Sequence, residues 1–174
     1  RNIKIRNNWL HNWSNSIRIA AGIVDGDIYC YNNIAYSHQK PFVVNDGTLK
    51  AGDLKIYNNI FLMKPDAPEL VPIGFSVNNF IINAGTSVEI RNNIAGFTSP
   101  STSGRYLILP NSVFGSLSVD YNLYWNSNRS EPFYWKGNRN IESWNKLGYD
   151  IHSIFNKDPL FRNLSGSYKQ DIDF

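Results

Sequence analysis

Asp27 and Asp53 are the residues in this sequence whose spacing most directly suggests chemistry. Each follows a glycine and precedes a short segment of alternating apolar residues. If the two segments are neighbouring strands, their backbones lie roughly 4.8 Å apart and the carboxylates come close together. Such a pair could raise the pKa of one carboxyl group for acid–base catalysis, or hold Ca²⁺ through oxygen ligands. The simpler alternative is that both are turn residues, because Asp bonds its own backbone readily.

Two further aspartates, Asp25 and Asp46, follow candidate strands. For them too the alternatives are a catalytic role and a structural role in a turn. These four aspartates are the candidate catalytic residues. Three cations, Arg18, Lys50 and Arg105, lie in or near candidate strands. They could neutralise an acidic ligand, or they could be solvated charges on the surface.

Six aromatic residues gather near the end of the sequence and could either stack against a ligand or fill a hydrophobic core. They are Tyr124, Trp125, Phe133, Tyr134, Trp135 and Trp144. Trp125 is the candidate for ligand binding. Two histidines, His11 and His38, could act as a general acid or base, or could be exposed loop residues. The sequence has no zinc-ligand spacing, phosphate-binding glycine loop or Gly-x-Ser-x-Gly motif.

The elements that must position these residues are five repeats of one pattern: apolar residues at every second position, then asparagines, then another apolar residue. The repeats cover residues 3–9, 28–34, 54–60, 88–94 and 117–123. Counted on the second asparagine, at positions 8, 33, 59, 93 and 122, the steps are 25, 26, 34 and 29 residues. Such steps with a strand-like pattern are typical of a solenoid, in which each repeat is one turn of a coil.

The alternation predicts two columns of inward-facing residues. The first column is Ile3, Ile28, Leu54, Val88 and Leu117, and the second is Ile5, Cys30, Ile56, Ile90 and Val119. Cys30 is therefore expected to be a small buried apolar residue. The apolar residue after each asparagine pair, at positions 9, 34, 60, 94 and 123, is expected to open the next inward set.

The asparagines themselves predict how the coils turn and join. The second asparagine is present in all five repeats, and Asn tolerates the left-handed backbone of a tight corner. Amides stacked at the strand spacing can also hydrogen-bond from coil to coil. We therefore expect this column both to turn the chain and to form a ladder. The first column ends in Tyr121 instead of Asn and is expected to face solvent.

Further strand candidates at residues 16–20, 41–44, 73–77 and 106–109 give each coil about three strands. The predicted fold is all-β: a right-handed parallel β-helix solenoid of about five coils with a short C-terminal capping helix. We expect the coils to span residues 1–125 and a cap and tail of the same domain to span residues 126–174. Insertions at residues 65–69, 78–86 and 98–104 explain the two long steps.

The two ends of the predicted solenoid differ. Residues 140–148 predict a short helix, with Asn140 as its N-cap and Gly148 just past its end. A solenoid end exposes its core and its strand edges, so this helix is the expected cap. At the other end, Arg1 begins almost inside a strand. We expect further coils, or another chain, to cover that end.

The repeats resemble those of the right-handed parallel β-helix proteins of the pectate-lyase-like superfamily. The pattern Ile-x-Ile-x-Asn-Asn-x-Ile covers residues 1–125, and residues 120–125, 144, 148–154 and 158–161 resemble the closing segment of many secreted members. The resemblance implies an extracellular or cell-surface protein that acts on a polysaccharide as a lyase or glycoside hydrolase. The alternative is a non-catalytic carbohydrate-binding or structural β-helix, such as a tailspike or adhesin segment.

The resemblance also implies roles for particular residues. Lyases of this superfamily usually neutralise the uronate with Ca²⁺ or a basic residue, and its hydrolases use paired carboxylates. Arg18, Lys50 and Arg105 would then contact an acidic sugar, and Trp125 would stack against it. Ca²⁺ is the one possible cofactor, and no metal ligands can be assigned. His152 is expected to tie down the tail through a hydrogen bond.

Composition narrows the choice of partners. The sequence has 17 Lys and Arg against 14 Asp and Glu, a net charge of +3, without a basic block, which does not favour nucleic acid. No stretch of 18 apolar residues is present, so no membrane span is expected. The single cysteine excludes an internal disulfide.

Overall fold

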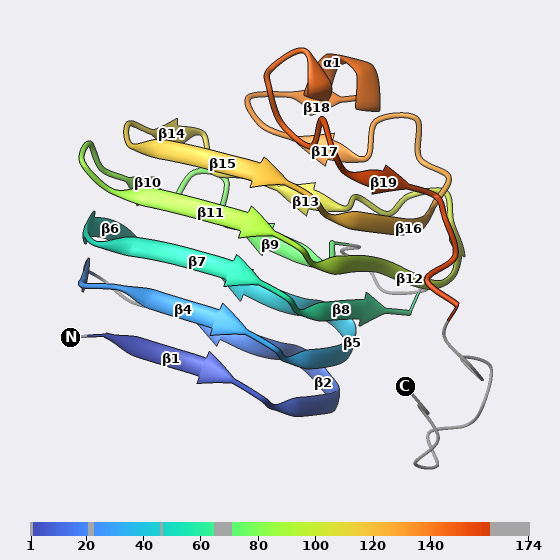
Figure 1. Ribbon diagram of the computed structural model, residues 1–174, viewed down its shortest axis with the longest axis horizontal. Helices are drawn as coiled ribbons and strands as arrows, with labels where there is room; N and C mark the ends of the chain where they lie inside the picture. Colours follow the sequence, from blue (N-terminus) through green and yellow to red (C-terminus); the bar gives the residue numbers. More distant parts are fainter. Residues whose placement is uncertain (1, 21–22, 46, 65–70, 161–174) are drawn as a thin grey trace.

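The computed structural model describes residues 2–160 apart from 21–22, 46 and 65–70. The chain forms a parallel β-solenoid of about five turns (Figure 1). It crosses the near face from left to right, returns behind that face and rises by one coil, which makes the solenoid right-handed (Figure 1). The predicted all-β parallel β-helix is therefore confirmed. No helix in the described part of the chain is long and apolar enough to cross a membrane.

The five repeats form one five-stranded parallel sheet, here called the first sheet. Its strands are β1 (Ile3–Arg6), β4 (Ile28–Tyr31), β7 (Asp53–Tyr57), β11 (Ser87–Arg91) and β15 (Ser116–Asp120). The register places each predicted inward column in line, so that Cys30 lies opposite Ile56 and Ile56 opposite Ile90. These three side chains are fully buried, as period-2 alternation on a one-sided sheet requires.

A ten-stranded sheet follows the corner and bends around the coil. Its strands are β2 (Trp9–Ile19), β5 (Ile34–Val44), β8 (Ile60–Met63), β9 (Ile73–Phe75), β12 (Ile94–Ser101), β13 (Leu107–Ile108), β16 (Leu123–Ser127), β17 (Phe133–Tyr134), β18 (Asn138–Arg139) and β19 (Ile154–Phe155). Strand β5 pairs with β8 through its first half and with β9 through its second half, so one strand serves two sides. The strands expected between the repeats fall at the ends of β2 and β5 and in β9 and β13.

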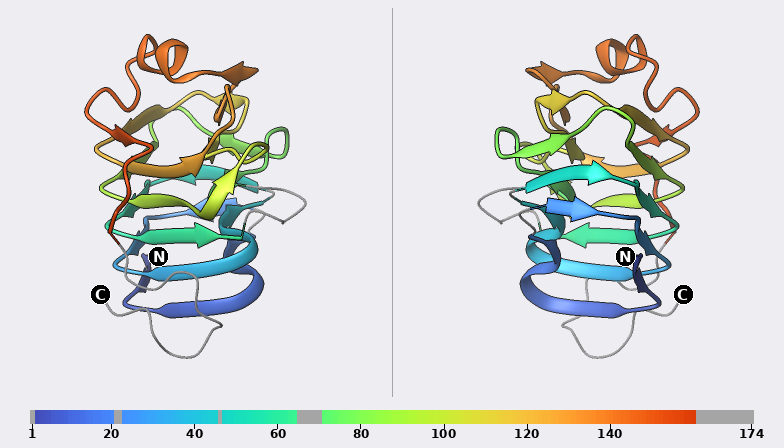
Figure 2. Two further views of the ribbon diagram at one scale, coloured as in Figure 1. Left: turned by 90° about the vertical axis from the view of Figure 1, so that its right-hand side faces the viewer. Right: turned by 90° about the vertical axis from the view of Figure 1, so that its left-hand side faces the viewer.

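A four-stranded sheet closes the remaining side of the coil and supplies the third strand expected in each coil, although its residues were not assigned from the sequence (Figures 1 and 2). It contains β3 (Ile23–Asp25), β6 (Gly47–Ala51), β10 (Phe80–Ile82) and β14 (Ser112–Val113). Strand β10 lies inside residues 78–86, which were expected to be an insertion. Phe80 and Ile82 are buried there, so this segment belongs to the core. The expected insertion at residues 65–69 lies outside the described residues, and the start of the one at 98–104 belongs to β12.

The prediction that the second asparagine turns the corner is wrong. The first column adopts the left-handed backbone: φ is 53° at Asn32, 55° at Asn58 and 58° at Tyr121. The members of this column are exposed, as expected. The corner therefore needs only a residue that tolerates positive φ and faces water, which explains how a tyrosine can replace asparagine there.

The second asparagine forms the ladder, as predicted. Asn59 is 1% exposed and accepts two hydrogen bonds from Asn33 on its Oδ1, from the backbone N and from Nδ2, each at 3.0 Å. Its own backbone N and Nδ2 donate in the same way to Asn93 Oδ1, again at 3.0 Å. Its Nδ2 also donates to the carbonyl of Cys30 at 2.9 Å. Each buried amide thus finds its partners one coil away, which fixes the register.

The side chain after each asparagine pair does not point inward, contrary to the prediction. Trp9 is 51% exposed, and Ile34, Ile60, Ile94 and Leu123 are partly exposed. The next residue faces the core instead, and Ala35, Phe61 and Ala95 are fully buried. The corner shifts the alternation by one residue, so a row of aliphatic side chains lies on the outside of the coil.

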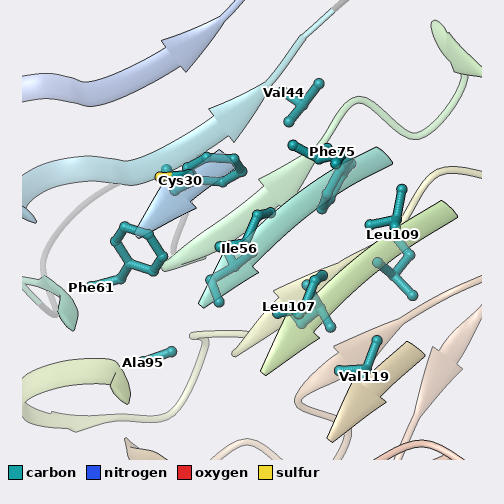
Figure 3. Packing of buried hydrophobic residues seen from close by; sticks show 14 of the residues in the cluster. Cys30, Val44, Ile56, Phe61, Phe75, Ala95, Leu107, Leu109 and Val119 are labelled. Atoms are coloured by element: carbon teal, nitrogen blue, oxygen red, sulfur yellow. The ribbon is translucent and has the colours of Figure 1, made fainter. Parts of the chain in front are cut away.

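The inward side chains of all three sheets meet in one core along the solenoid axis (Figure 3). Cys30 and Phe61 lie near Ile56 in the middle coils, and Val119 lies at the last coil (Figure 3). Cys30 is fully buried, as predicted, and this burial raises the pKa of its thiol to about 12. The thiol is therefore a packing group and not a nucleophile.

The C-terminal helix α1 (Ile141–Asn145) lies above the last coil (Figure 1). Asn140 caps it by accepting a hydrogen bond from Ser143 N at 2.8 Å, as predicted. Trp144 is fully buried and stacks on Phe133 with ring centroids 4.7 Å apart. The carboxylate of Asp150, 1% exposed, accepts hydrogen bonds from Trp144 and from three further side chains. The cap thus covers the core with aromatic rings held by one buried carboxylate.

The two asparagine columns predict opposite responses to mutation. Replacing Asn59 by Ala removes the acceptor of the buried Asn33 N and Nδ2 and the side-chain donor to Asn93 Oδ1 and the Cys30 carbonyl, so we expect a loss of about 2–4 kcal/mol in the free energy of unfolding. The matched control is Asn58→Gly, which keeps the positive φ and should change stability by less than about 1 kcal/mol. Urea denaturation measures both. Equal effects of the two substitutions would show that the buried ladder contributes no more to the free energy of unfolding than the exposed corner does.

Candidate functional site

The outer face of the first sheet brings charged and aromatic side chains into three parallel columns. The columns are Asp27, Asp53, Ser87 and Ser116; Lys4, Tyr29, Lys55, Glu89 and Ser118; and Arg6, Tyr31, Tyr57, Arg91 and Asp120. Alternation along each strand directs these residues outward because their neighbours fill the core. The stacking of coils then repeats each position at the strand spacing, so the face forms a continuous strip along the solenoid.

Asp27 and Asp53 lie next to each other, as the repeat predicted. Asp27 Oδ1 accepts a hydrogen bond from Asp53 N at 3.0 Å, and Asp53 Oδ1 accepts one from Ser87 Oγ at 2.6 Å. The other Asp27 oxygen accepts from the hydroxyl of Tyr29 at 3.2 Å. One oxygen of each carboxylate therefore links consecutive coils, a structural role that differs from the bond to its own backbone that the turn interpretation expected.

The glycines before these aspartates are required by the corner. Gly26 and Gly52 have φ of 119° and 88°. A Cβ on Gly52 would lie 2.5 Å from the carbonyl carbon of Gly26 and 2.8 Å from Asp27 Oδ1. Only glycine allows this close stacking of two left-handed corners, so the Gly-Asp sequence is explained by backbone geometry.

Charges in the middle of the face compensate one another. The ammonium of Lys55 lies 3.6 Å from Asp53 Oδ2 and 4.0 Å from Glu89 Oε2, and Arg91 Nε lies 2.8 Å from Glu89 Oε1. These side chains are partly exposed, so each pair adds little to stability. These side chains matter to a binding site because of where they lie: hydrogen-bond donors and acceptors alternate along the solenoid axis, where a ligand can reach them.

Aromatic rings accompany the charges. Tyr31 and Tyr57 stack with centroids 5.0 Å apart and an interplanar angle of 2°. One coil further on, Arg91 takes the same register position, and its guanidinium lies 5.9 Å from the ring centroid of Tyr121. Both stacked tyrosines remain partly exposed. The column offers hydroxyl groups, ring edges and cations in one line.

Of the other two predicted catalytic aspartates, the one that the structure describes does not join this face. Asp25 ends β3 in the four-stranded sheet, where it is exposed. Asp46 lies outside the described residues. His11 is exposed in β2, and His38 belongs to β5. Among the predicted aspartates that the structure describes, Asp27 and Asp53 are therefore the two brought together.

The predicted ligand-binding residues are dispersed over other sides of the solenoid. Arg18 is exposed in β2 and Lys50 is exposed in β6. Arg105 donates to Asn138 at 2.9 Å and lies 5.8 Å from the ring centroid of Tyr134, and burial lowers the pKa of its guanidinium. Trp125 is only 9% exposed and packs outside the coil in a cluster with Tyr36 and Leu62. These four residues do not converge on one site.

A histidine–aspartate pair lies at the end of the third column and was missed as a site. His152 Nδ1 lies 2.6 Å from Asp120 Oδ2, and His152 N donates to Asp120 Oδ1 at 2.8 Å. The expected hydrogen bond that ties down the tail is thus confirmed. A carboxylate at this distance holds the proton on Nδ1, which leaves Nε2 of the neutral ring as a base. The imidazole stacks on Tyr121 with centroids 4.9 Å apart.

This pair borders a shallow depression of about 300 Å³ at the corner of the last coils. Its lining consists of Asn92, Asn93, Ile94, Tyr121, Asn122, Leu123, His152 and Ile154. Aliphatic side chains from the outer row form one part of the lining, while the tyrosine, histidine and exposed asparagine supply polar groups. Such a combination suits a ring with one apolar face and polar edges.

The environment of Asp120 favours its charged form. Burial opposes ionisation, but the hydrogen bonds from the side chain and backbone of His152 and from the backbone of Tyr121 outweigh it and lower the pKa of Asp120. The sequence held one signal of this arrangement: Asp120 is the only acidic residue in a column otherwise made of Arg and Tyr. Its partner could not be inferred, because His152 lies beyond the last repeat.

Comparison with known proteins adds no further assignment. No family model, curated protein or solved structure matches this chain. Within the described residues, no group of three or more His, Cys, Asp or Glu side chains could hold a metal ion.

The lowered pKa of Asp120 predicts how acid affects the tail. A carboxyl group with a lower pKa in the folded state stabilises the fold above its unfolded pKa, and this contribution is lost as the pH falls through the folded pKa. We expect Asp120→Asn to cost about 1–3 kcal/mol at neutral pH. The difference from the parent should begin to shrink below the ordinary Asp pKa of about 3.9, where the unfolded chain takes up the proton, and should be lost once the folded carboxylate is protonated as well. Denaturation at a series of pH values measures this difference.

The matched control is Ser118→Ala, which changes an exposed neighbour on the same strand without altering an ionisable group. Its difference from the parent should not vary with pH. A difference between Asp120→Asn and the parent that stays constant down to pH about 2 would contradict the proposed charge interaction.

Proposed function

We propose that this chain is part of an extracellular or cell-surface carbohydrate-active β-helix protein of the pectate-lyase-like type, and that a polysaccharide binds along the outer face of the first sheet. The observation that supports this proposal best is the strip of aligned tyrosines, cations and carboxylates. The strip runs along the solenoid axis and repeats at each coil, as an extended repeating ligand requires.

The chemistry of the strip suits sugars. Hydroxyl groups on a pyranose ring hydrogen-bond best to charged or hydroxyl-bearing side chains, and the C–H faces of the ring pack against aromatic rings. Lys55, Glu89 and Arg91 supply the charged groups, while Tyr31 and Tyr57 supply rings and hydroxyls. Since all these groups are partly exposed and already held by one another, a ligand meets them in a preorganised state.

The charge balance of the strip bears on the class of polysaccharide. Lys55 and Arg91 are paired with carboxylates, whereas Lys4 and Arg6 are exposed at the edge of the sheet and have no ion-pair partner among the described residues. An acidic polysaccharide would gain most from the edge coil, and a neutral one from the middle. Polyuronates and neutral polysaccharides are therefore separate arms of the test.

Binding is tested by titrating the protein with a panel of polyuronates and neutral polysaccharides in a calorimeter. We expect one class to bind, and the double variant Tyr31→Ala/Tyr57→Ala to weaken binding at least about tenfold, equivalent to about 1.4 kcal/mol. The matched control Lys50→Ala removes an exposed cation from the four-stranded sheet and should leave affinity unchanged. Absence of binding across the panel, or equal losses in the two variants, would reject the proposed face.

Catalysis is the second part of the proposal and depends on a separate observation. One oxygen of Asp27 and one of Asp53 accept hydrogen bonds from the next coil, and their second oxygens lie against Tyr29 and Lys55. His152, in contrast, is held by Asp120 beside the depression. We therefore assign the acid–base role in any lyase or hydrolase reaction to His152. The non-catalytic alternative, a tailspike or adhesin segment, requires the face but not this histidine.

The two alternatives differ in turnover. With the polysaccharide that binds, we expect release of unsaturated uronate or of new reducing ends, and His152→Asn should lower this rate by about 100-fold with little change in affinity. The matched control His11→Asn alters an exposed histidine in β2 and should retain full activity. Normal turnover in His152→Asn would exclude the assigned role, and absence of turnover in the parent would favour the non-catalytic alternative.

A further inference from the structure

The asparagine ladder has a direction. At every step the backbone N and Nδ2 of one asparagine donate to Oδ1 of the asparagine in the following coil. Asn8 donates in this way to Asn33, and Asn93 donates to Asn122, with Nδ2–Oδ1 distances of 2.8 Å and 3.1 Å. The donors to Oδ1 therefore point toward the C-terminal cap, and the Oδ1 acceptors point toward β1. The second hydrogen of Nδ2 instead reaches a backbone carbonyl of the preceding coil, from Asn33 to Ile5 and from Asn59 to Cys30.

The two ends of the ladder are consequently different in chemistry. At the cap, Asn122 N donates to Ser153 Oγ at 2.8 Å and Asn122 Nδ2 donates to Asp150 Oδ1 at 3.0 Å. These two acceptors close the ladder within the chain. At the other end, no donor in the described part of the chain reaches Asn8 Oδ1. The ladder is therefore terminated by its own cap at one end and presents an open acceptor at the other.

The core and the strand edges are open at the same end. Ile3 is 49% exposed, whereas Ile28, its counterpart one coil further, is 3% exposed. Among the described strands, β1 pairs only with β4, and β2 pairs only with β5. Since alternate amides of a parallel strand point to opposite neighbours, the N–H groups of Lys4 and Arg6 lie on the open edge of β1.

We propose that this end binds a further parallel β-coil whose corner presents an asparagine, with its backbone N–H and side-chain NH₂ directed at Asn8 Oδ1. Such a coil would also pair with the edges of β1 and β2 and cover Ile3. This inference rests on the ladder and does not depend on the proposed function.

A second copy of this chain does not meet the same requirements. Two copies joined through this end place the Oδ1 of one Asn8 opposite that of the other, an acceptor against an acceptor. A copy joined head to tail presents its cap, where Asp150 and Ser153 already accept the donors of Asn122. The direction of the ladder therefore selects a coil with free donors and rejects self-association.

The test supplies such a coil from the chain itself. A copy of residues 28–52 is joined directly ahead of Asn2 of the full chain, so that the copied Asn33 meets Asn8. We expect the melting temperature to rise by at least about 5 °C. Hydrogen exchange at the amides of Lys4 and Arg6 should slow by at least about tenfold.

The matched control carries Asn33→Asp within the copied coil only. The carboxylate has the same shape as the amide but no side-chain donor, so this fusion should melt at least about 3 °C below the asparagine fusion. Equal melting and equal exchange in the two fusions would overturn the proposal, as would an added coil that protects neither amide. Sedimentation showing that the parent dimerises, and that the added coil abolishes the dimer, would identify a second copy as the occupant and overturn it too.

Discussion

A buried amide must find hydrogen-bond partners, and in this protein each coil supplies them for the next. Asn33, Asn59 and Asn93 are each 1% exposed, and their donors and acceptors are used within the ladder or by backbone carbonyls of adjacent strands. A slip of one residue would break this whole row at once, so the ladder fixes the register of the first sheet. The register in turn aligns the outward columns, and the candidate binding face is a consequence of that alignment.

Much of the fold could be predicted, because the alternation of apolar residues and the asparagine present in every repeat both indicate which side chains are buried. The roles of the two asparagines could not be separated in the same way, because Asn suits both a left-handed corner and a buried ladder. Tyr121 was the distinguishing residue: a tyrosine can occupy an exposed corner but cannot continue an amide ladder. The shift of phase after the corner was missed because Ile34 and Ile60 are as apolar as core residues, while the true inward residue Ala35 is small.

The candidate site likewise contains one contact that the sequence predicts and others that it does not. The contact between Asp27 and Asp53 followed from the repeat, since equal positions in stacked coils must be neighbours. The pairing of Asp120 with His152 joins a repeat to the tail across 32 residues, and no periodicity predicts such a contact. Arg18 and Lys50 were grouped by charge alone, and the structure places them on strands of different sheets. This separation could not be predicted, because the sequence does not show where the coil bends.

The central claim is that one buried, directional asparagine ladder organises the molecule, and exchange of the side-chain amide protons measured by NMR tests it most directly. The account predicts slow exchange at Asn33, Asn59 and Asn93, and equally slow exchange at Asn122, which Asp150 closes. Asn8, at the open end, should exchange at least about 100-fold faster. Similar rates at all five asparagines, or slow exchange at Asn8 in the isolated chain, would contradict the account.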